Sequence, residues 1–260
     1  MAYRPVPLLL LALLLVACPV EAQDKEQEKG PASPDALRDS IESEIDGAGV
    51  PGAGVVLFSA DSIRWEGYFG LADRVSERPV TDKTVFRAGS ISKSVVSTAS
   101  LLMVEEGRLD LQAPVRDLAP EIKIQNPWAD TDPVRVVHLL EHTAGFDDFE
   151  IHEYVSRSPN ITLREGLAIN PATRQVRWRP GMYSSYSNAG PPVAAYIVEK
   201  KSGQPFNSFV IDRIFEPLGM RASSFLRDDR TKGHLATGYA ADGETEGEAG
   251  GARFVIGEVD

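Results

Sequence analysis

One stretch of the sequence, Phe86-Arg87-Ala88-Gly89-Ser90-Ile91-Ser92-Lys93, decides how the chain is interpreted. It follows two strand-like segments and opens an apolar helical pattern that begins near Ser90. That pattern runs to about Glu106, where Gly107 is the expected helix stop. Residues three apart in a helix lie on one face, about one turn from each other. The sequence therefore predicts that Ser90 and Lys93 lie side by side at a helix start.

This Ser-x-x-Lys pair has the chemistry of an activated nucleophile. Backbone N–H groups at a helix N-terminus favour negative charge on the Ser90 oxygen. Desolvation favours the neutral amine of a lysine, which can accept the proton of a nearby hydroxyl. Gly89 allows close approach of a substrate or of a neighbouring chain. Taken alone, the spacing also fits simpler roles, in which Ser90 caps the helix and Lys93 is a solvated residue of its first turn.

A second motif lies near residue 186, in the stretch Pro180-Gly181-Met182-Tyr183-Ser184-Ser185-Tyr186-Ser187-Asn188. In an extended segment, Tyr186 and Asn188 point the same way. A tyrosine hydroxyl near a lysine can relay protons, and an asparagine can orient both that lysine and a substrate carbonyl. The alternative is a loop in which Tyr186 packs its ring and Asn188 lies in a turn. The chain contains no other Tyr-x-Asn, which favours a functional pairing with Ser90 and Lys93.

Outward from these motifs, the pattern predicts a mixed α+β fold. A helix capped by Ser33 is expected through about Ile45, with Pro34 at its first position. A β-hairpin is expected next, with strands at 52–58 and 63–71 and its turn at 59–62. Further helices are expected at 134–141, 192–201 and 205–215. Near the end, residues 240–252 are rich in glycine and acidic groups and predict a surface excursion, and residues 253–260 resume a strand-like pattern.

The N-terminus has the features of an export signal. Arg4 supplies a positive charge, and residues 6–16 form an apolar run that is too short to span a bilayer. We expect residues 1–22 to be a signal peptide, cleaved after Ala22 or, alternatively, lipidated at Cys18, which is the only cysteine. Residues 23–34 predict a flexible tether. The protein is thus expected to be periplasmic or secreted, and to contact a membrane only if it is a lipoprotein.

Composition sets limits on the remaining function classes. The 260 residues are 42% hydrophobic and 25% charged, which predicts one large globular domain. A net charge of -11 argues against nucleic acid or anionic lipid as the main partner. We expect no cofactor and no metal. A minor alternative is a zinc peptidase, because His138-x-x-Glu141-His142 matches an H-x-x-E-H pattern, although Gly145 would end the required helix early.

Four motifs in their order along the chain resemble the serine β-lactamase and penicillin-binding superfamily. They are residues 86–93, His138-Leu139-Leu140-Glu141-His142-Thr143-Ala144-Gly145, residues 180–188 and Pro217-Leu218-Gly219-Met220. The chain is most similar to the class C β-lactamase-related branch, which includes esterases and D-aminopeptidases. The resemblance covers roughly residues 35–240. It implies a β-lactamase-like fold, with an antiparallel sheet flanked by helices and a mainly helical second domain.

The resemblance also implies roles for the motif residues. Ser90 would be the acylated nucleophile, Lys93 its base partner and Tyr186 the proton relay, with Asn188 in a positioning role. The implied activity is that of an exported serine hydrolase acting on an amide, β-lactam or ester carbonyl of a small-molecule or peptide substrate. A non-catalytic penicillin-recognising or peptidoglycan-sensing module would keep Ser90 but turn over slowly or not at all, and it stays an alternative.

The chain departs from the superfamily pattern in one respect. Members carry a third motif, a Lys or His followed by a small residue and Gly, on a late strand beside the nucleophile. Lys201-Ser202-Gly203 has these letters but ends a predicted helix, where Gly203 is explained as a cap. We therefore expect the domain at 35–260 to lack its C-terminal strands, and its activity to be impaired because an oxyanion donor contributes about 10²–10³ in turnover.

Overall fold

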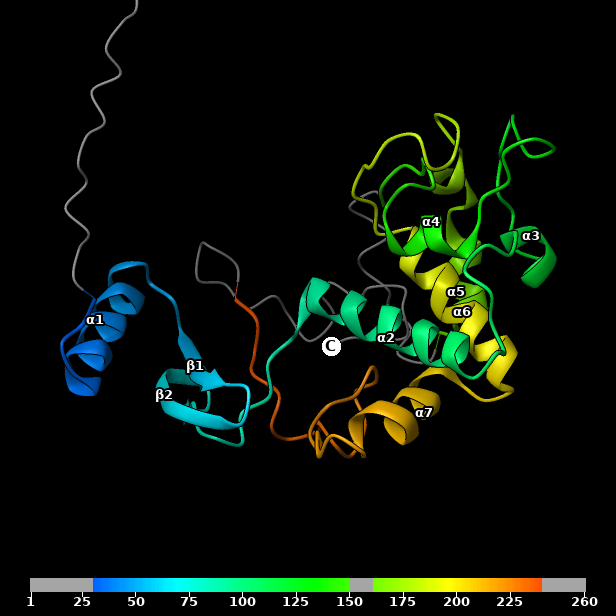
Figure 1. The fold of residues 1–260 in the computed structure, drawn as a ribbon. Helices are drawn as coiled ribbons and strands as arrows, with labels where there is room; N and C mark the ends of the chain where they lie inside the picture. The colour runs from blue at the N-terminus through cyan, green and yellow to red at the C-terminus, as the bar shows by residue number, and fades with distance from the viewer. Residues whose placement is uncertain (1–29, 150–160, 240–260) are drawn as a thin grey trace, which may run out of the picture.

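The computed structural model describes residues 30–149 and 161–239, which form two parts (Figure 1). One part, here called the hairpin part, contains α1 and a small sheet, and the other, the helical part, is built around α2 and α6. The predictions for residues 1–22, 240–252 and 253–260, and for most of the tether, lie outside the described residues. Within the described ranges, no helix is both long and apolar enough to cross a membrane.

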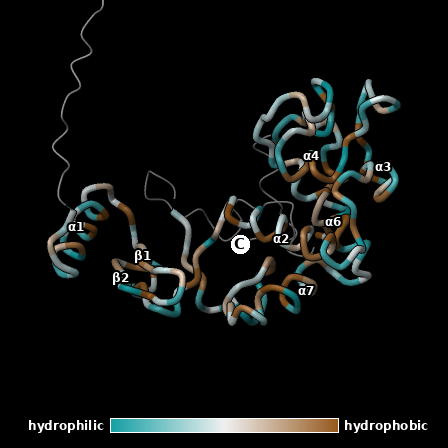
Figure 2. Tube along the Cα trace, in the orientation of Figure 1, coloured by the Kyte–Doolittle hydropathy of each residue, from teal (hydrophilic) through white to brown (hydrophobic). Residues whose placement is uncertain are grey.

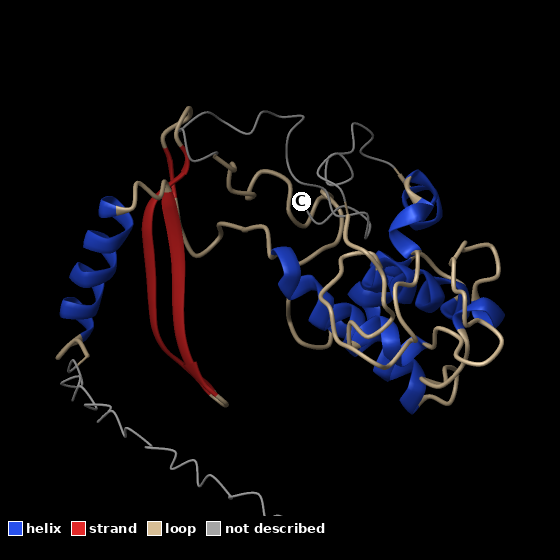
Figure 3. Ribbon diagram, turned by 90° about the horizontal axis from the view of Figure 1, so that it is seen from above, coloured by secondary structure: helices blue, strands red, loops and turns tan. Residues whose placement is uncertain are grey.

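Helix α1 (Pro34–Gly47) begins where the sequence predicts it. The Ser33 hydroxyl accepts a hydrogen bond from the Ala36 N–H at 3.1 Å, and proline occupies the first turn. The helix lies along one side of the two long strands (Figure 3), and the guanidinium of Arg38 lies over the rings of Trp65 and Phe69. None of its own residues is fully buried. Helix α1 therefore covers the sheet through a thin contact rather than through a packed core.

The sheet has the strand order β1-β2-β3 and is antiparallel throughout. The predicted hairpin is confirmed as β1 (Gly52–Ser59) and β2 (Ser62–Asp73), and the short β3 (Arg78–Pro79) pairs with the end of β2. Gly70 in β2 has a φ of 63°, and a Cβ there would lie 2.3 Å from the Pro51 carbonyl oxygen. Glycine is required at this point because both the backbone conformation and the space exclude a side chain.

The helical part contains the main hydrophobic core. Figure 2 shows hydrophobic residues along α2, α6 and α7, whose side chains belong to one buried cluster. Its elements are η1 (Gly89–Ile91), α2 (Ser92–Glu105), α3 (Val115–Leu118), α4 (Val136–Leu140), α5 (Leu163–Ile169), η3 (Pro171–Arg174), α6 (Gly190–Ser202), α7 (Phe206–Val210) and a π-helical turn, η4 (Ile211–Phe215). Helix α2 packs against α6, and α6 also contacts α4, α5 and α7. The predicted helix at 205–215 is thus divided between α7 and η4.

The segment 234–239 joins the two parts. Val85 donates its N–H to His234 O at 2.9 Å, and its own carbonyl accepts from the Ala236 N–H at 2.8 Å. Thr237 N–H donates to Ala72 O in β2 at 2.8 Å. These bonds hold the residues just before the Ser90 motif against the hairpin part, so the start of α2 is fixed relative to the sheet.

Candidate active site

Ser90 lies in η1, immediately before the 14-residue helix α2. Gly89 has a φ of 52° with open space around it, so the left-handed backbone rather than crowding favours glycine there. The buried Ser92 hydroxyl donates to Gly89 O at 2.7 Å and fixes this turn from inside. Ser90 itself is exposed and lies at the N-terminal end of the helix, where backbone N–H groups favour negative charge.

Two polar groups converge on the Ser90 hydroxyl. Lys93 Nζ donates to Ser90 Oγ at 3.0 Å, as the one-turn spacing predicts. The Tyr186 hydroxyl lies 2.6 Å from the same oxygen, although the two residues are 96 positions apart. Lys93 Nζ also lies 4.9 Å from the centroid of the Tyr186 ring. The structure therefore brings Ser90, Lys93 and Tyr186 into one constellation.

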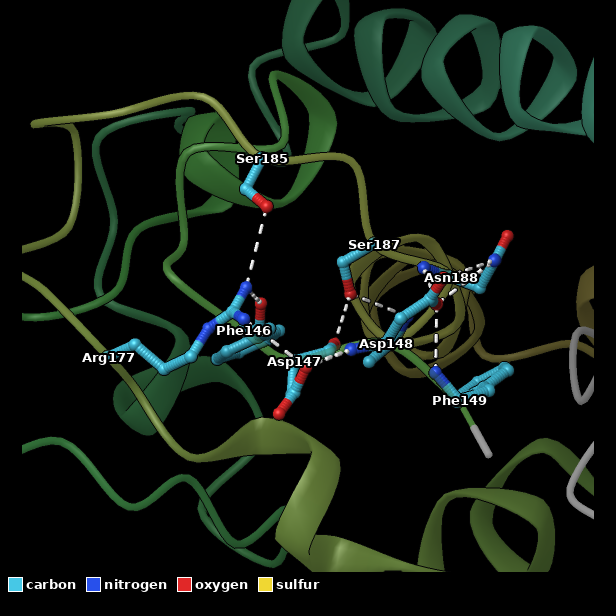
Figure 4. A network of polar contacts seen from close by, with 9 residues as sticks. Phe146, Asp147, Asp148, Phe149, Arg177, Ser185, Ser187 and Asn188 are labelled. Atoms are coloured by element: carbon cyan, nitrogen blue, oxygen red, sulfur yellow. Dashed lines mark hydrogen bonds and ion pairs between the residues drawn. The ribbon is translucent and has the colours of Figure 1, made fainter. Parts of the chain in front are cut away.

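Asn188 follows Tyr186 by two residues and is only 6% exposed. Figure 4 shows it beside Asp148. Its Nδ2 donates to both carboxylate oxygens of Asp148, at 3.0 and 3.3 Å, and its backbone N–H donates to Asp148 Oδ1 at 2.8 Å. Because the carboxylate accepts from the amide nitrogen, the amide oxygen is directed the other way. That oxygen accepts from the Tyr186 hydroxyl at 3.4 Å. Asn188 thus positions Tyr186, and Asp148 determines the orientation of Asn188.

Either hydroxyl can donate the bond between Ser90 and Tyr186. Lys93 donates to Ser90, and the Tyr186 hydroxyl also reaches Asn188 Oδ1. When Tyr186 turns its single proton towards Asn188, its oxygen accepts from Ser90. The network therefore offers the serine proton an acceptor in the Tyr186 oxygen.

The loop that carries Tyr186 is fastened to residues 146–148 (Figure 4). Ser187 Oγ donates to Asp147 O at 2.6 Å, and the Arg177 guanidinium donates to Phe146 O at 2.7 Å. Arg177 also contacts the Asp147 carboxylate at 3.3 Å and Ser185 Oγ at 3.4 Å. The position of Tyr186 is consequently set by tertiary contacts on both sides of the loop.

The zinc-peptidase alternative is not supported by the geometry of its motif. Helix α4 ends at Leu140, and His142 has a left-handed φ of 59°, so His138 and His142 do not share a helix face. Their Nδ1 atoms accept the N–H groups of Arg135 and Ser187, at 3.1 and 3.2 Å. No cluster of three or more possible ligands occurs within residues 30–149 and 161–239. A zinc site of this type requires a helix that continues through His142, and α4 ends before that residue.

The sequence analysis assigned two neighbours of Ser90 and Tyr186, Asp148 and His142, no part in this site. Asp148 accepts hydrogen bonds from Asn188. The only local signal for this role was the acidic pair Asp147-Asp148 shortly after Gly145. The His142 ring lies 4.6 Å from the Tyr186 ring, centroid to centroid. By contrast, Gly203 ends α6 with a φ of 79°, which confirms its predicted role as a helix cap.

The mixed fold, with Ser90 and Lys93 at the start of α2 and Tyr186 reaching them from the loop before α6, is that of the serine β-lactamase and penicillin-binding superfamily. Residues 37–255 match the Beta-lactamase family, and the chain belongs to that family. Both the resemblance and the α+β fold class predicted from the sequence are confirmed.

Relatives in this family carry several activities in their names. A β-lactamase of Yersinia enterocolitica is 28% identical over 191 residues, covering 74% of this chain and 46% of the relative. Esterase EstB of Burkholderia gladioli is 31% identical over 167 residues, covering 60% of this chain and 42% of the esterase. The chain thus spans about half the length of these curated relatives.

Solved structures support the same fold. The octameric penicillin-binding protein homologue from Pyrococcus abyssi superimposes with a TM-score of 0.71 at 27% identity. The match covers 84% of this chain and 52% of that one. The names of these related proteins specify different acyl compounds, namely β-lactams, esters and penicillin.

Proposed function

We propose that the protein is a serine hydrolase that forms an acyl-enzyme at Ser90 with an ester, amide or β-lactam carbonyl. The observation that carries the proposal is the convergence on Ser90 Oγ of the Tyr186 hydroxyl at 2.6 Å and Lys93 Nζ at 3.0 Å. These neighbours allow the serine to lose its proton as it attacks a carbonyl carbon. A serine that only caps a helix would not require them.

The reaction follows from the groups around Ser90 Oγ. Ser90 Oγ attacks the carbonyl carbon while its proton passes to Lys93 Nζ, 3.0 Å away, which accepts it as a free amine; the Tyr186 hydroxyl relays the proton towards the leaving group. The N–H groups at the start of α2 face the negative charge that develops on the carbonyl oxygen. The leaving group then takes the proton as its bond to carbon breaks. In the second half, water attacks the acyl carbon and releases the acid, and Ser90 regains a proton.

The substrate class rests on the names of the relatives and on charge. The β-lactamase and esterase relatives act on carbonyl compounds that differ in their leaving groups. This fits a site whose catalytic residues interact with the carbonyl group that these compounds share. The formal charge of -11 disfavours polyanionic partners and is compatible with small-molecule or peptide acyl compounds. Export, as the N-terminal pattern predicts, would bring the protein to such substrates outside the cytoplasm.

Covalent labelling tests the proposal directly. A fluorophosphonate probe and a penicillin should each add one adduct to the full chain, located at Ser90 by mass spectrometry. Ser90→Ala should abolish both labelling and ester hydrolysis. Ser94→Ala is the matched control, because Ser94 is an exposed serine on the next turn whose hydroxyl donates to Ile91 O at 2.6 Å.

Two outcomes would redirect the assignment. Labelling that persists in Ser90→Ala would show that another nucleophile reacts, and the proposed mechanism would be wrong. A penicillin adduct that forms at Ser90 but is not released over many hours would indicate the penicillin-recognising module instead of a hydrolase. Release of the adduct together with turnover of a chromogenic ester supports the hydrolase.

A further inference from the structure

We propose that His142 is a positioning residue that holds the Tyr186 hydroxyl over Ser90, and that this arrangement requires its imidazole to be neutral. The inference rests on the proposed function, because it assigns His142 a part in the same acylation step. It extends that function to a histidine that the sequence analysis named only in the zinc alternative and in a superfamily motif.

The first observation is a direct ring contact. The imidazole of His142 lies 4.6 Å from the Tyr186 ring, with an angle of 31° between the ring planes. Lys93 Nζ also lies near the Tyr186 ring, 4.9 Å from its centroid. A tyrosine that is 52% exposed has few neighbours to restrict it, so a contact with its face contributes strongly to where its hydroxyl lies.

The second observation is that His142 binds the residues on both sides of Tyr186. The Ser185 N–H donates to the His142 carbonyl oxygen at 2.9 Å, and the Ser187 N–H donates to His142 Nδ1 at 3.2 Å. One residue therefore contacts the tyrosine ring and fixes the backbone immediately before and after it. Removing the imidazole would remove the ring contact and one of the two backbone bonds.

The third observation is the backbone conformation of His142. Its φ of 59° is left-handed, and within the described ranges Glu77 is the only other non-glycine residue with a positive φ. Such a conformation costs of order 1–3 kcal/mol and persists where the surroundings impose it. The strain places the His142 carbonyl and ring so that both meet the Tyr186 loop. A residue that only filled space would not require this geometry.

Charge gives the arrangement a pH dependence. Burial, and next the positive charge of Lys93 on α2, hold the pKa of His142 below its usual range, while the Asp148 carboxylate acts in the opposite direction. Because Nδ1 accepts the Ser187 N–H, the neutral ring carries its proton on Nε2. Protonation at low pH would remove that acceptor and add a cation beside Lys93 and Tyr186. The loop should then release Tyr186, and acylation should slow.

The test compares two histidine variants across a range of pH in the full chain. His142→Asn keeps an acceptor and tolerates a left-handed backbone but lacks the ring, whereas His142→Gly lacks both the ring and the acceptor. The measurement is the second-order rate of Ser90 labelling by a fluorophosphonate. We expect a decrease of about 10- to 100-fold, larger for glycine, because misplacing a proton-transfer group by about 1 Å has effects of this size. In both variants, the labelling rate should fall less steeply than in the wild type as the pH decreases.

His138→Asn is the matched control. His138 is also half-buried, its pKa is also lowered first by burial, and its Nδ1 also accepts a backbone N–H, at 3.1 Å from Arg135. It lies against Gly181 rather than against Tyr186. This variant should keep the labelling rate and the acid-side profile of the wild type, even if its melting temperature falls.

The outcomes separate this inference from the proposed function. Wild-type protein that never labels at Ser90 contradicts the proposed function, and the role of His142 with it. Wild-type protein that labels, with His142→Asn showing the same rate and acid-side profile, contradicts the role of His142 alone. If His142→Gly does not fold, His142→Asn decides, because asparagine tolerates the left-handed backbone.

Discussion

The helical part and the hairpin part bury their apolar side chains to very different degrees. On α2, the side chains of Val96, Ala99 and Met103 are completely buried against α6 and its neighbours. On the hairpin, Phe58 and Ile63 leave 77% and 60% of their surfaces exposed. The first part has a continuous core of its own, whereas the second has only a few buried residues beneath α1.

This difference explains where the site is built. Ser90 and Lys93 belong to the start of α2, and the loop with Tyr186 leads directly into α6. Helices that pack against each other hold such groups more precisely than an exposed hairpin does. The hairpin part reaches the site through segment 234–239 and Val85. Changes in the helical core should therefore affect stability and site together, and changes on the hairpin should affect neither strongly.

The largest expected effect comes from one phenylalanine in each part. Phe209 on α7 is 1% exposed, and Phe209→Ala should lower the free energy of unfolding by about 3–5 kcal/mol, because it leaves a cavity in the core. Phe58→Ala, at a side chain that is mostly exposed, should change it by about 0.5 kcal/mol or less. Urea unfolding of the full chain, followed by tryptophan fluorescence, measures both.

The two variants also test whether the parts unfold as one unit. If Phe58→Ala proves as destabilising as Phe209→Ala, then the hairpin face is covered in solution and the contrast between the parts is wrong. A second transition that appears only in Phe209→Ala would show that the hairpin part unfolds separately.

Much of the fold was predictable because its signals are local. Ser33 and Pro34 mark the start of α1 by cap chemistry, and Gly203 marks the end of α6 by its left-handed backbone. The Ser-x-x-Lys spacing placed Lys93 beside Ser90 because one helical turn determines that contact. Each of these features depends on residues within about four positions of one another.

The rest of the site depends on contacts between distant residues. Asp148 meets Asn188 across 40 positions, and no spacing rule links them. The ring contact of His142 with Tyr186 also joins distant segments, and the predicted end of the helix before His142 gave no sign of it. Helix α5, in contrast, was missed although Thr162 and Glu165 form a capping box that can be recognised in the sequence.

The second prediction compares an aspartate in each part. Asp148→Asn replaces the carboxylate that orients Asn188 with an amide, whose own N–H groups compete with the donors of Asn188. The orientation of the Asn188 amide, and with it the acceptor for Tyr186, is then no longer fixed. We expect Ser90 labelling by a fluorophosphonate to slow by about 10- to 100-fold, as for other small displacements of reacting groups.

The matched control for this prediction is Asp61→Asn in the hairpin turn. Asp61 accepts from Ser59 Oγ at 2.9 Å and from Ser62 Oγ at 3.3 Å, and it is exposed. Labelling should be unchanged in this variant. An Asp148→Asn protein that labels at the wild-type rate over the whole pH range would show that Asn188 keeps its orientation without the carboxylate.

The smallest expected effect concerns acid stability. In the helical part, Glu121 accepts from Lys200 Nζ at 2.7 Å and from the Tyr196 hydroxyl at 2.6 Å. The bond from Lys200, followed by that from Tyr196, lowers the pKa of Glu121 to about 2. A carboxyl whose folded pKa lies below its unfolded value of 4.5 stabilises the fold above that value. This contribution is lost as the pH falls from about 4.5 towards 2.

Glu121→Gln should therefore make the stability less dependent on pH in that interval. The pair is partly exposed, so its contribution is about 1 kcal/mol or less. The control is Glu66→Gln on the hairpin, where the carboxylate accepts from the Tyr68 hydroxyl at 2.7 Å. Urea midpoints measured at several acidic pH values should follow the wild-type slope in the control. Equal slopes in all three proteins would mean that Glu121 is not held by Lys200 in solution. The polar contacts of α6 would then contribute no more to stability than those of the hairpin, and only apolar burial would distinguish the two parts.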